Sequence, residues 1–126
     1  MENQETLEIG IGTKEFKKLE AKKVKIEKVE IEIVKVNEKD NKKITCKCKH
    51  PDVEDLISVG SVKIEKDGKL EVTGLWINKD EDGKIRKGST LAMFMNFCAA
   101  PTIKDLEGKE IQTVEDTKGY LCFKAY

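Results

Sequence analysis

The sequence is poor in the features that mark membrane, secreted and catalytic proteins. No apolar run approaches the ~20 residues of a membrane-spanning helix. The first five residues are acidic and polar, unlike a basic and then apolar leader. The chain has a single histidine, and no nucleophile-elbow, Walker or dinucleotide-binding motif occurs. These absences predict a cytoplasmic protein that is not an enzyme, uses no cofactor and does not contact a membrane.

A surplus of charge of one sign is also missing, because 24 basic residues balance 24 acidic ones. No global field therefore draws the chain toward nucleic acid or a membrane surface, and any polyanion must be held by a local patch. The length of 126 residues is that of one domain. We expect residues 1–18 to form an arm or short strand, and residues 19–126 to form a single β-rich domain.

What the chain does have is alternation of apolar and polar residues, which is typical of β-strands. The parity of the first long run slips between Ile26 and Val29, which predicts a β-bulge. A second change of parity between Ile33 and Val36 predicts further curvature. Asp67-Gly68 lies between two alternating runs and predicts a tight hairpin turn. A second hairpin is expected over 111–126.

One helix is predicted near residues 90–98. Ser89 is a suitable N-cap, and Pro101 marks the end of the helix. Its apolar residues cover almost the whole circumference, which is typical of a helix that is buried on several sides or forms a contact surface.

The resulting order is a long bent strand, a strand, a hairpin, the helix and a final hairpin. Over residues 20–126 this order resembles the OB-fold of single-stranded nucleic-acid-binding proteins, and it implies a mainly β protein with one main helix and a small β-barrel. An extra strand before the helix departs from the usual five strands. An α+β arrangement, in which an antiparallel sheet packs on one helix, is therefore the alternative.

Two patterns imitate metal sites. Cys46-x-Cys48-x-His50 lies on a predicted strand, where the flat backbone does not fold around a zinc ion. We therefore interpret both cysteines as small buried hydrophobic residues. Asn78-x-Asp80-x-Asp82 resembles a calcium loop, but position 12 of that loop is Ser89 instead of a glutamate. A polar turn explains these residues, and we predict no metal site.

Cationic and aromatic residues favour binding of single-stranded DNA or RNA. Lys84, Arg86 and Lys87 precede the predicted helix, whose N-terminus favours anions. In the last strand Leu121, Phe123 and Ala125 form the expected core face. The opposite face, which includes Cys122, would expose Tyr120, Lys124 and Tyr126 for stacking on bases and pairing with phosphates. Trp76 shares a face with Leu70 and Val72 and is interpreted as a core residue, although it would stack if exposed.

The alternative function is that of a protein-interaction or assembly factor. It depends on the apolar helix 90–98, in which Met93, Phe94 and Phe97 would contact a protein partner or a second copy of the chain. Methionine side chains adapt readily to different partners.

Overall fold

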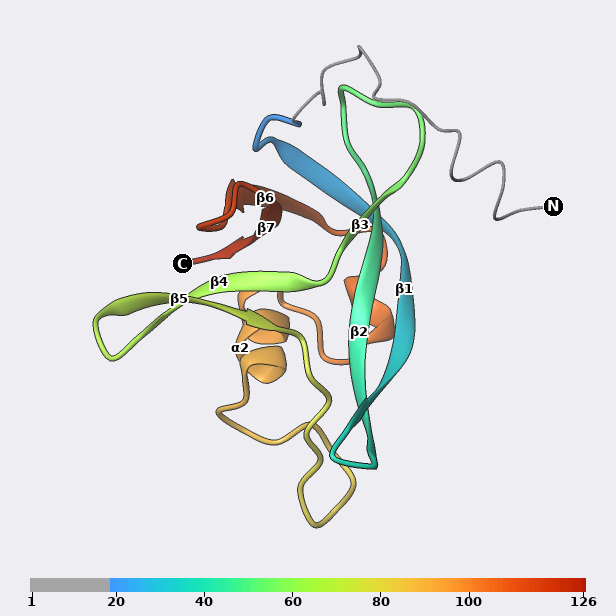
Figure 1. Cartoon of the computed structure of the whole chain (residues 1–126), viewed down its shortest axis with the longest axis vertical. Helices are drawn as coiled ribbons and strands as arrows, with labels where there is room; N and C mark the ends of the chain where they lie inside the picture. The colour runs from blue at the N-terminus through green and yellow to red at the C-terminus, as the bar shows by residue number, and fades with distance from the viewer. Residues whose placement is uncertain (1–18) are drawn as a thin grey trace, which may run out of the picture.

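The computed structural model describes residues 19–126, so the arm expected over residues 1–18 lies outside the described part (Figure 1). Its elements in chain order are β1 (Lys23–Val36), β2 (Lys39–Lys49), β3 (Ile57–Val59), β4 (Ser61–Lys66), β5 (Lys69–Gly74), α2 (Thr90–Phe97), the 3-10 turn η1 (Lys104–Leu106), β6 (Glu110–Glu115) and β7 (Leu121–Ala125). For residues 19–126, the prediction of a mainly β fold with one main helix is confirmed.

The strands form one sheet in the order β3-β2-β1-β6-β7-β4-β5, which is not closed into a barrel. The predicted barrel is therefore not confirmed. The pairs are antiparallel except for β4 and β7, which run parallel. Only Gly60 separates β3, which pairs with β2, from β4, which pairs with β7.

The predicted β-bulge in β1 is confirmed, because the register against β2 shifts between Ile26 and Lys28. Here β1 leaves β6, and Glu107 stabilises the bend. The Glu107 Oε2 atom accepts a hydrogen bond from the Val29 amide at 3.0 Å. The second change of parity is not accompanied by a bulge, because the pairing with β2 runs without a shift from Lys28 to Val36. Beyond the bulge the two strands continue as a long twisted ribbon (Figure 1).

The core lies between the inner face of the sheet and α2. Its largest fully buried side chains include Phe94 of α2 and Phe123 of β7, whose rings stack with centroids 4.9 Å apart. The Ser89 side chain accepts a hydrogen bond from the Ala92 amide at 3.2 Å, so the predicted N-cap is confirmed. At the β4–β5 turn, Asp67 and Gly68 both adopt positive φ angles, 52° and 77°, as the predicted tight turn requires.

Candidate nucleic-acid interface

The outer face of the β4–β5 hairpin carries apolar side chains that are open to solvent. Val72 lies opposite Lys63 in the ladder, and Lys63 lies opposite Lys124 of β7. Because directly opposed residues point to the same side of a sheet, these three side chains share one face. Leu70 is also on this face, and it is 48% exposed while Val72 is 38% exposed. The side chains on the other side of β4 pack in the core.

Trp76 extends this face beyond the end of β5. Residues 72, 74 and 76 alternate along the strand direction, so Trp76 lies on the same side as Val72. The indole lies over the Gly74 backbone, where an added Cβ would be 2.9 Å from the Trp76 Nε1 atom. On β2, Lys43 lies directly opposite Trp76 and places its Nζ atom 5.6 Å from the indole centroid. Trp76 is half-buried, so its interpretation as a core residue is wrong.

The last strand presents a second aromatic residue beside a cation. Tyr126 is 40% exposed, and the Lys124 Nζ atom lies 4.9 Å from the centroid of its ring. Tyr120, before the strand, is 65% exposed. The predicted exposure of Cys122 on this side is wrong, because its side chain is fully buried. On the predicted core face, Phe123 is buried, while Leu121 and Ala125 are half-buried.

We call the shared surface the outer face and define it by its cationic and aromatic members and the two apolar residues between them: Lys43, Lys63, Leu70, Val72, Trp76, Lys124 and Tyr126. No sequence motif singles out Lys43 or Lys63. The signal for Lys43 was present, because it alternates with the buried Ile44 and Cys46 of β2. A carboxylate also borders this surface, since the Glu32 Oε2 atom lies 3.9 Å from the Lys43 Nζ atom.

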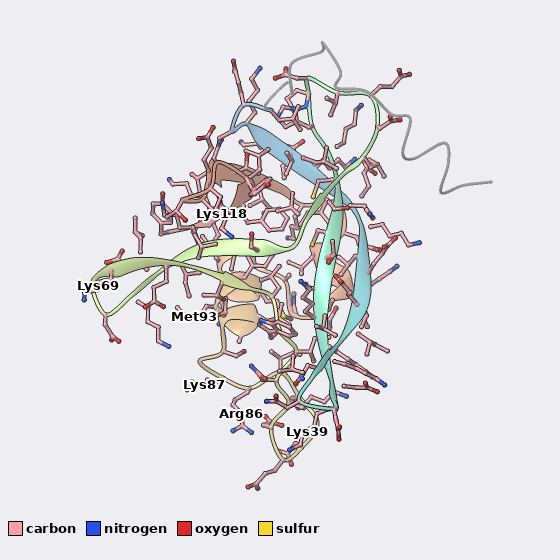
Figure 2. The ribbon with its side chains drawn as sticks, in the orientation of Figure 1. Lys39, Lys69, Arg86, Lys87, Met93 and Lys118 are labelled. Carbon is pink, nitrogen blue, oxygen red and sulfur yellow. The ribbon has the colours of Figure 1, made fainter. Side chains whose placement is uncertain are left out.

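The basic loop of Lys84, Arg86 and Lys87 lies elsewhere. Lys84 and Arg86 belong to a small hairpin over residues 78–86, and Lys87 follows it. In this hairpin Asp80 Oδ1 accepts hydrogen bonds from the amides of Asp82 and Lys84. This turn geometry accounts for the calcium-like pattern. In Figure 2, Arg86 and Lys87 are far from Lys118, which lies in the turn before β7. The structure therefore does not bring the loop together with Tyr120, Lys124 and Tyr126.

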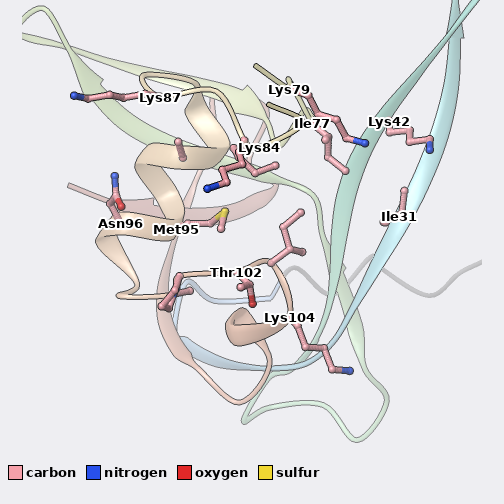
Figure 3. A pocket seen from close by; sticks show the side chains of 16 residues that line it. Ile31, Lys42, Ile77, Lys79, Lys84, Lys87, Met95, Asn96, Thr102 and Lys104 are labelled. Carbon is pink, nitrogen blue, oxygen red and sulfur yellow. The ribbon is translucent and has the colours of Figure 1, made fainter. Parts of the chain in front are cut away.

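Lys84 and Lys87 instead line a cavity of about 900 Å³ (Figure 3). Ile77 and Lys42 also line it, and the Ile77 amide donates a hydrogen bond to the Lys42 carbonyl at 2.8 Å. Side chains alternate across a strand, so the neighbouring residues Trp76 and Lys43 point to the opposite side. The cavity and the outer face are thus two sides of the same stretch of sheet.

The helix offers less contact surface than its sequence predicted. Phe94 is fully buried against Phe123, so its assignment to a partner interface is wrong. Met93 is half-buried and packs against the core, and Phe97 is 52% exposed. The apolar circumference of α2 therefore mainly reflects burial.

His50 and the cysteines of β2 are also structural. His50 is buried, its Nε2 atom lies 2.8 Å from the Glu20 carbonyl oxygen, and its Nδ1 atom accepts a hydrogen bond from the Asp52 amide at 3.0 Å. Burial raises the pKa of Cys46 and of Cys48 to about 12. Within residues 19–126 no group of three or more His, Cys, Asp or Glu side chains is placed to hold a metal ion.

These thiols are expected to react very slowly in the folded protein. A pKa near 12 instead of 9.0 lowers the thiolate fraction at pH 8 by roughly a thousandfold, and burial also blocks the reagent. Mass spectrometry after iodoacetamide treatment at pH 8 should find Cys46 and Cys48 unmodified without denaturant and alkylated in 6 M guanidinium. Rapid alkylation of either residue under native conditions would contradict the buried position of β2.

Comparison of the chain with protein-family models, with curated proteins and with solved structures finds no match. In the part of the chain that the structure describes, no helix has the length and apolar character needed to cross a membrane.

Proposed function

We propose that this protein is a non-catalytic binding module that holds single-stranded DNA or RNA on its outer face. One observation carries the proposal: the strand register and the indole position gather aromatic and lysine side chains on one surface, from β2, β4, the end of β7 and the segment after β5. Tyr126 is exposed there, and Trp76 and the lysines are half-buried. Aromatic rings stack on bases of any sequence, and neighbouring lysines pair with phosphates. Such binding tolerates many sequences and weakens with salt.

The spacing of the aromatic residues fits a strand that lies across the sheet. Gly74, under the Trp76 indole, pairs with Ser61 at the start of β4. Ala125, next to Tyr126, pairs with Ile64 farther along β4. The two rings therefore lie toward opposite ends of the outer face, with Lys63 between them. Bases would stack at the ends, and the intervening phosphates would meet lysines.

We also propose that the strands form an OB-like arrangement. In its support, β1 pairs with both β2 and β6, β6 pairs with β7, and β7 pairs with β4. In addition, β3 pairs with β2 and continues into β4 through Gly60, so the chain itself links β2 and β4 at that residue although the sheet is open. In OB-folds the strand 2–3 face binds oligonucleotides, and β2 and β4 supply the corresponding part of the outer face here.

The test is a titration of the purified protein with single-stranded oligonucleotides at low and at moderate salt, followed by Trp76 emission and by probe anisotropy. We expect saturable binding, quenching of the only tryptophan, and an affinity that falls as salt rises. Duplex DNA is the control, since its bases are not free to stack. Absence of binding at low salt, or binding without any change in Trp76 emission, would contradict the proposal.

A further inference from the structure

We propose that the cavity on the opposite side of β2 binds a small anionic amphiphile, a ligand with an aliphatic body and one carboxylate or phosphate head group. The cavity lies between the β1–β2 ribbon, the hairpin over residues 78–86, α2 and the segment over residues 100–104 (Figure 3). Its volume of about 900 Å³ is within the range of small-molecule sites, ~300–1,000 Å³. It is a separate site from the outer face.

The walls of the cavity are aliphatic. The apolar lining residues come from every segment around it and are Ile31, Ile77, Ile85, Ala92, Met95, Ala100, Pro101 and Ile103. Among the residues that the structure describes, no aromatic ring lines the cavity, so these walls lack the stacking surfaces that bases use. Ile31 is 60% exposed, and a bound apolar group would remove part of this surface from water. These walls favour an aliphatic ligand over a nucleotide.

The charge of the cavity is of one sign. Its lining includes Lys42, Lys79, Lys84, Lys87 and Lys104, and no aspartate or glutamate of residues 19–126 is part of it. Lys104 is paired with Glu107, with its Nζ atom 2.6 Å from Oε1. The other lysines form no ion pair with any residue of 19–126. In a chain with a net charge of zero, this local surplus attracts an anion.

The positions of the lysines indicate where the head group would lie. In Figure 3, Lys42 and Lys79 lie on the side of the β1–β2 ribbon, Lys84 lies between them and Met95, and Lys87 extends away from the others. We therefore assign the head group to the side of Lys42 and Lys79, while Lys84 adds positive charge from the side of α2, and we assign the aliphatic body to the apolar lining that includes Met95 and Ile103. Asn96 and Thr102 are the polar uncharged residues of the lining.

The experiment uses three probes with the same ten-carbon chain: decanoate, decyl phosphate and decyltrimethylammonium, each below its micelle concentration. Methyl NMR of the isoleucine and methionine side chains reports where each probe binds. We expect saturable shifts at Met95, Ile77 and Ile103 with the anions, and at least tenfold weaker binding of the cation. The two anionic probes distinguish a carboxylate from a phosphate head group. Equal binding of the cationic probe, or no saturable shift with either anion, would overturn the proposal.

Variants separate this site from the outer face. The combined substitution of Lys42, Lys79 and Lys84 by glutamine changes exposed side chains only, and we expect it to weaken decanoate binding by at least tenfold. The matched variant replaces Lys43, Lys63 and Lys124 by glutamine and should bind decanoate as the unmodified protein does. If oligonucleotide binding is absent while decanoate binding persists, the proposed function fails and this inference stands; the reverse result overturns the inference alone.

Discussion

Replacement of Phe94 with alanine is expected to lower the free energy of unfolding by about 3–5 kcal/mol, the usual cost of truncating a fully buried phenylalanine. The Phe94 ring is 0% exposed and stacks on Phe123 with an interplanar angle of 22°. This contact joins α2 to β7, so the substitution leaves a cavity between helix and sheet. Since domains are stable by only ~5–15 kcal/mol, the loss is a large fraction of the total. Urea unfolding followed by circular dichroism measures it.

The matched control for this prediction is Phe97→Ala on the same helix. Phe97 is 52% exposed, and substitutions of this kind at the surface usually change stability by about 0.5 kcal/mol or less. Both variants replace phenylalanine with alanine in the same helix, so the difference between their free energies of unfolding reports burial and not helix propensity. Equal stability of both variants would mean that α2 is not packed as described. If the unmodified protein is an oligomer and Phe94→Asp is a folded monomer, Phe94 instead belongs to a partner interface.

Local features of this fold were predictable because short-range chemistry decides them. The change of parity between Ile26 and Val29 predicts the bulge, and the Asp67-Gly68 pair predicts the turn that only positive φ angles allow. Ser89 predicts the start of α2, since its hydroxyl can satisfy an otherwise unpaired amide.

The side of a strand that faces the core was harder to predict. In β5 the apolar residues Leu70 and Val72 indicated the core face, yet both are exposed on the outer face. The sheet order explains this result, because β5 is an edge strand whose hairpin with β4 extends past the core (Figure 1). Cys122 is the opposite case, since β7 is a central strand and a side chain expected in solvent is buried.

The sequence indicates only one part of the cavity lining, Lys84 and Lys87 before α2. Lys42, Lys79 and Lys104 are far apart in the chain, and each is one lysine among many in a highly charged sequence. They share one cavity because residue 77 pairs with β2 and because the segment after α2 returns toward the β1–β2 ribbon. Only long-range pairing reveals which lysines line the same cavity.

The outer face yields the second large effect, a loss of nucleic-acid affinity in Trp76→Ala and Tyr126→Ala. Stacking of a base on an aromatic side chain is worth ~1–3 kcal/mol, so each substitution should weaken binding by about 5- to 150-fold. Trp76→Phe retains a ring and should recover most of the affinity, which distinguishes stacking from a general change in the fold. Anisotropy titrations with one labelled oligonucleotide compare the variants directly.

The lysines of the outer face would pair with phosphates, so their effect appears in how the nucleic-acid affinity depends on salt concentration. Each phosphate contact contributes ~0.7 to the slope of log affinity against log salt for a single strand. Replacing Lys43, Lys63 and Lys124 by glutamine should therefore reduce that slope by about 2. The control replaces Lys84, Arg86 and Lys87, which removes the same charge from the basic loop and should leave the slope unchanged, because Lys84 and Lys87 line the cavity on the opposite side of β2. If the control variant loses the slope and the outer-face variant keeps it, the nucleic acid lies along the basic loop, and Trp76 and Tyr126 are not part of its site.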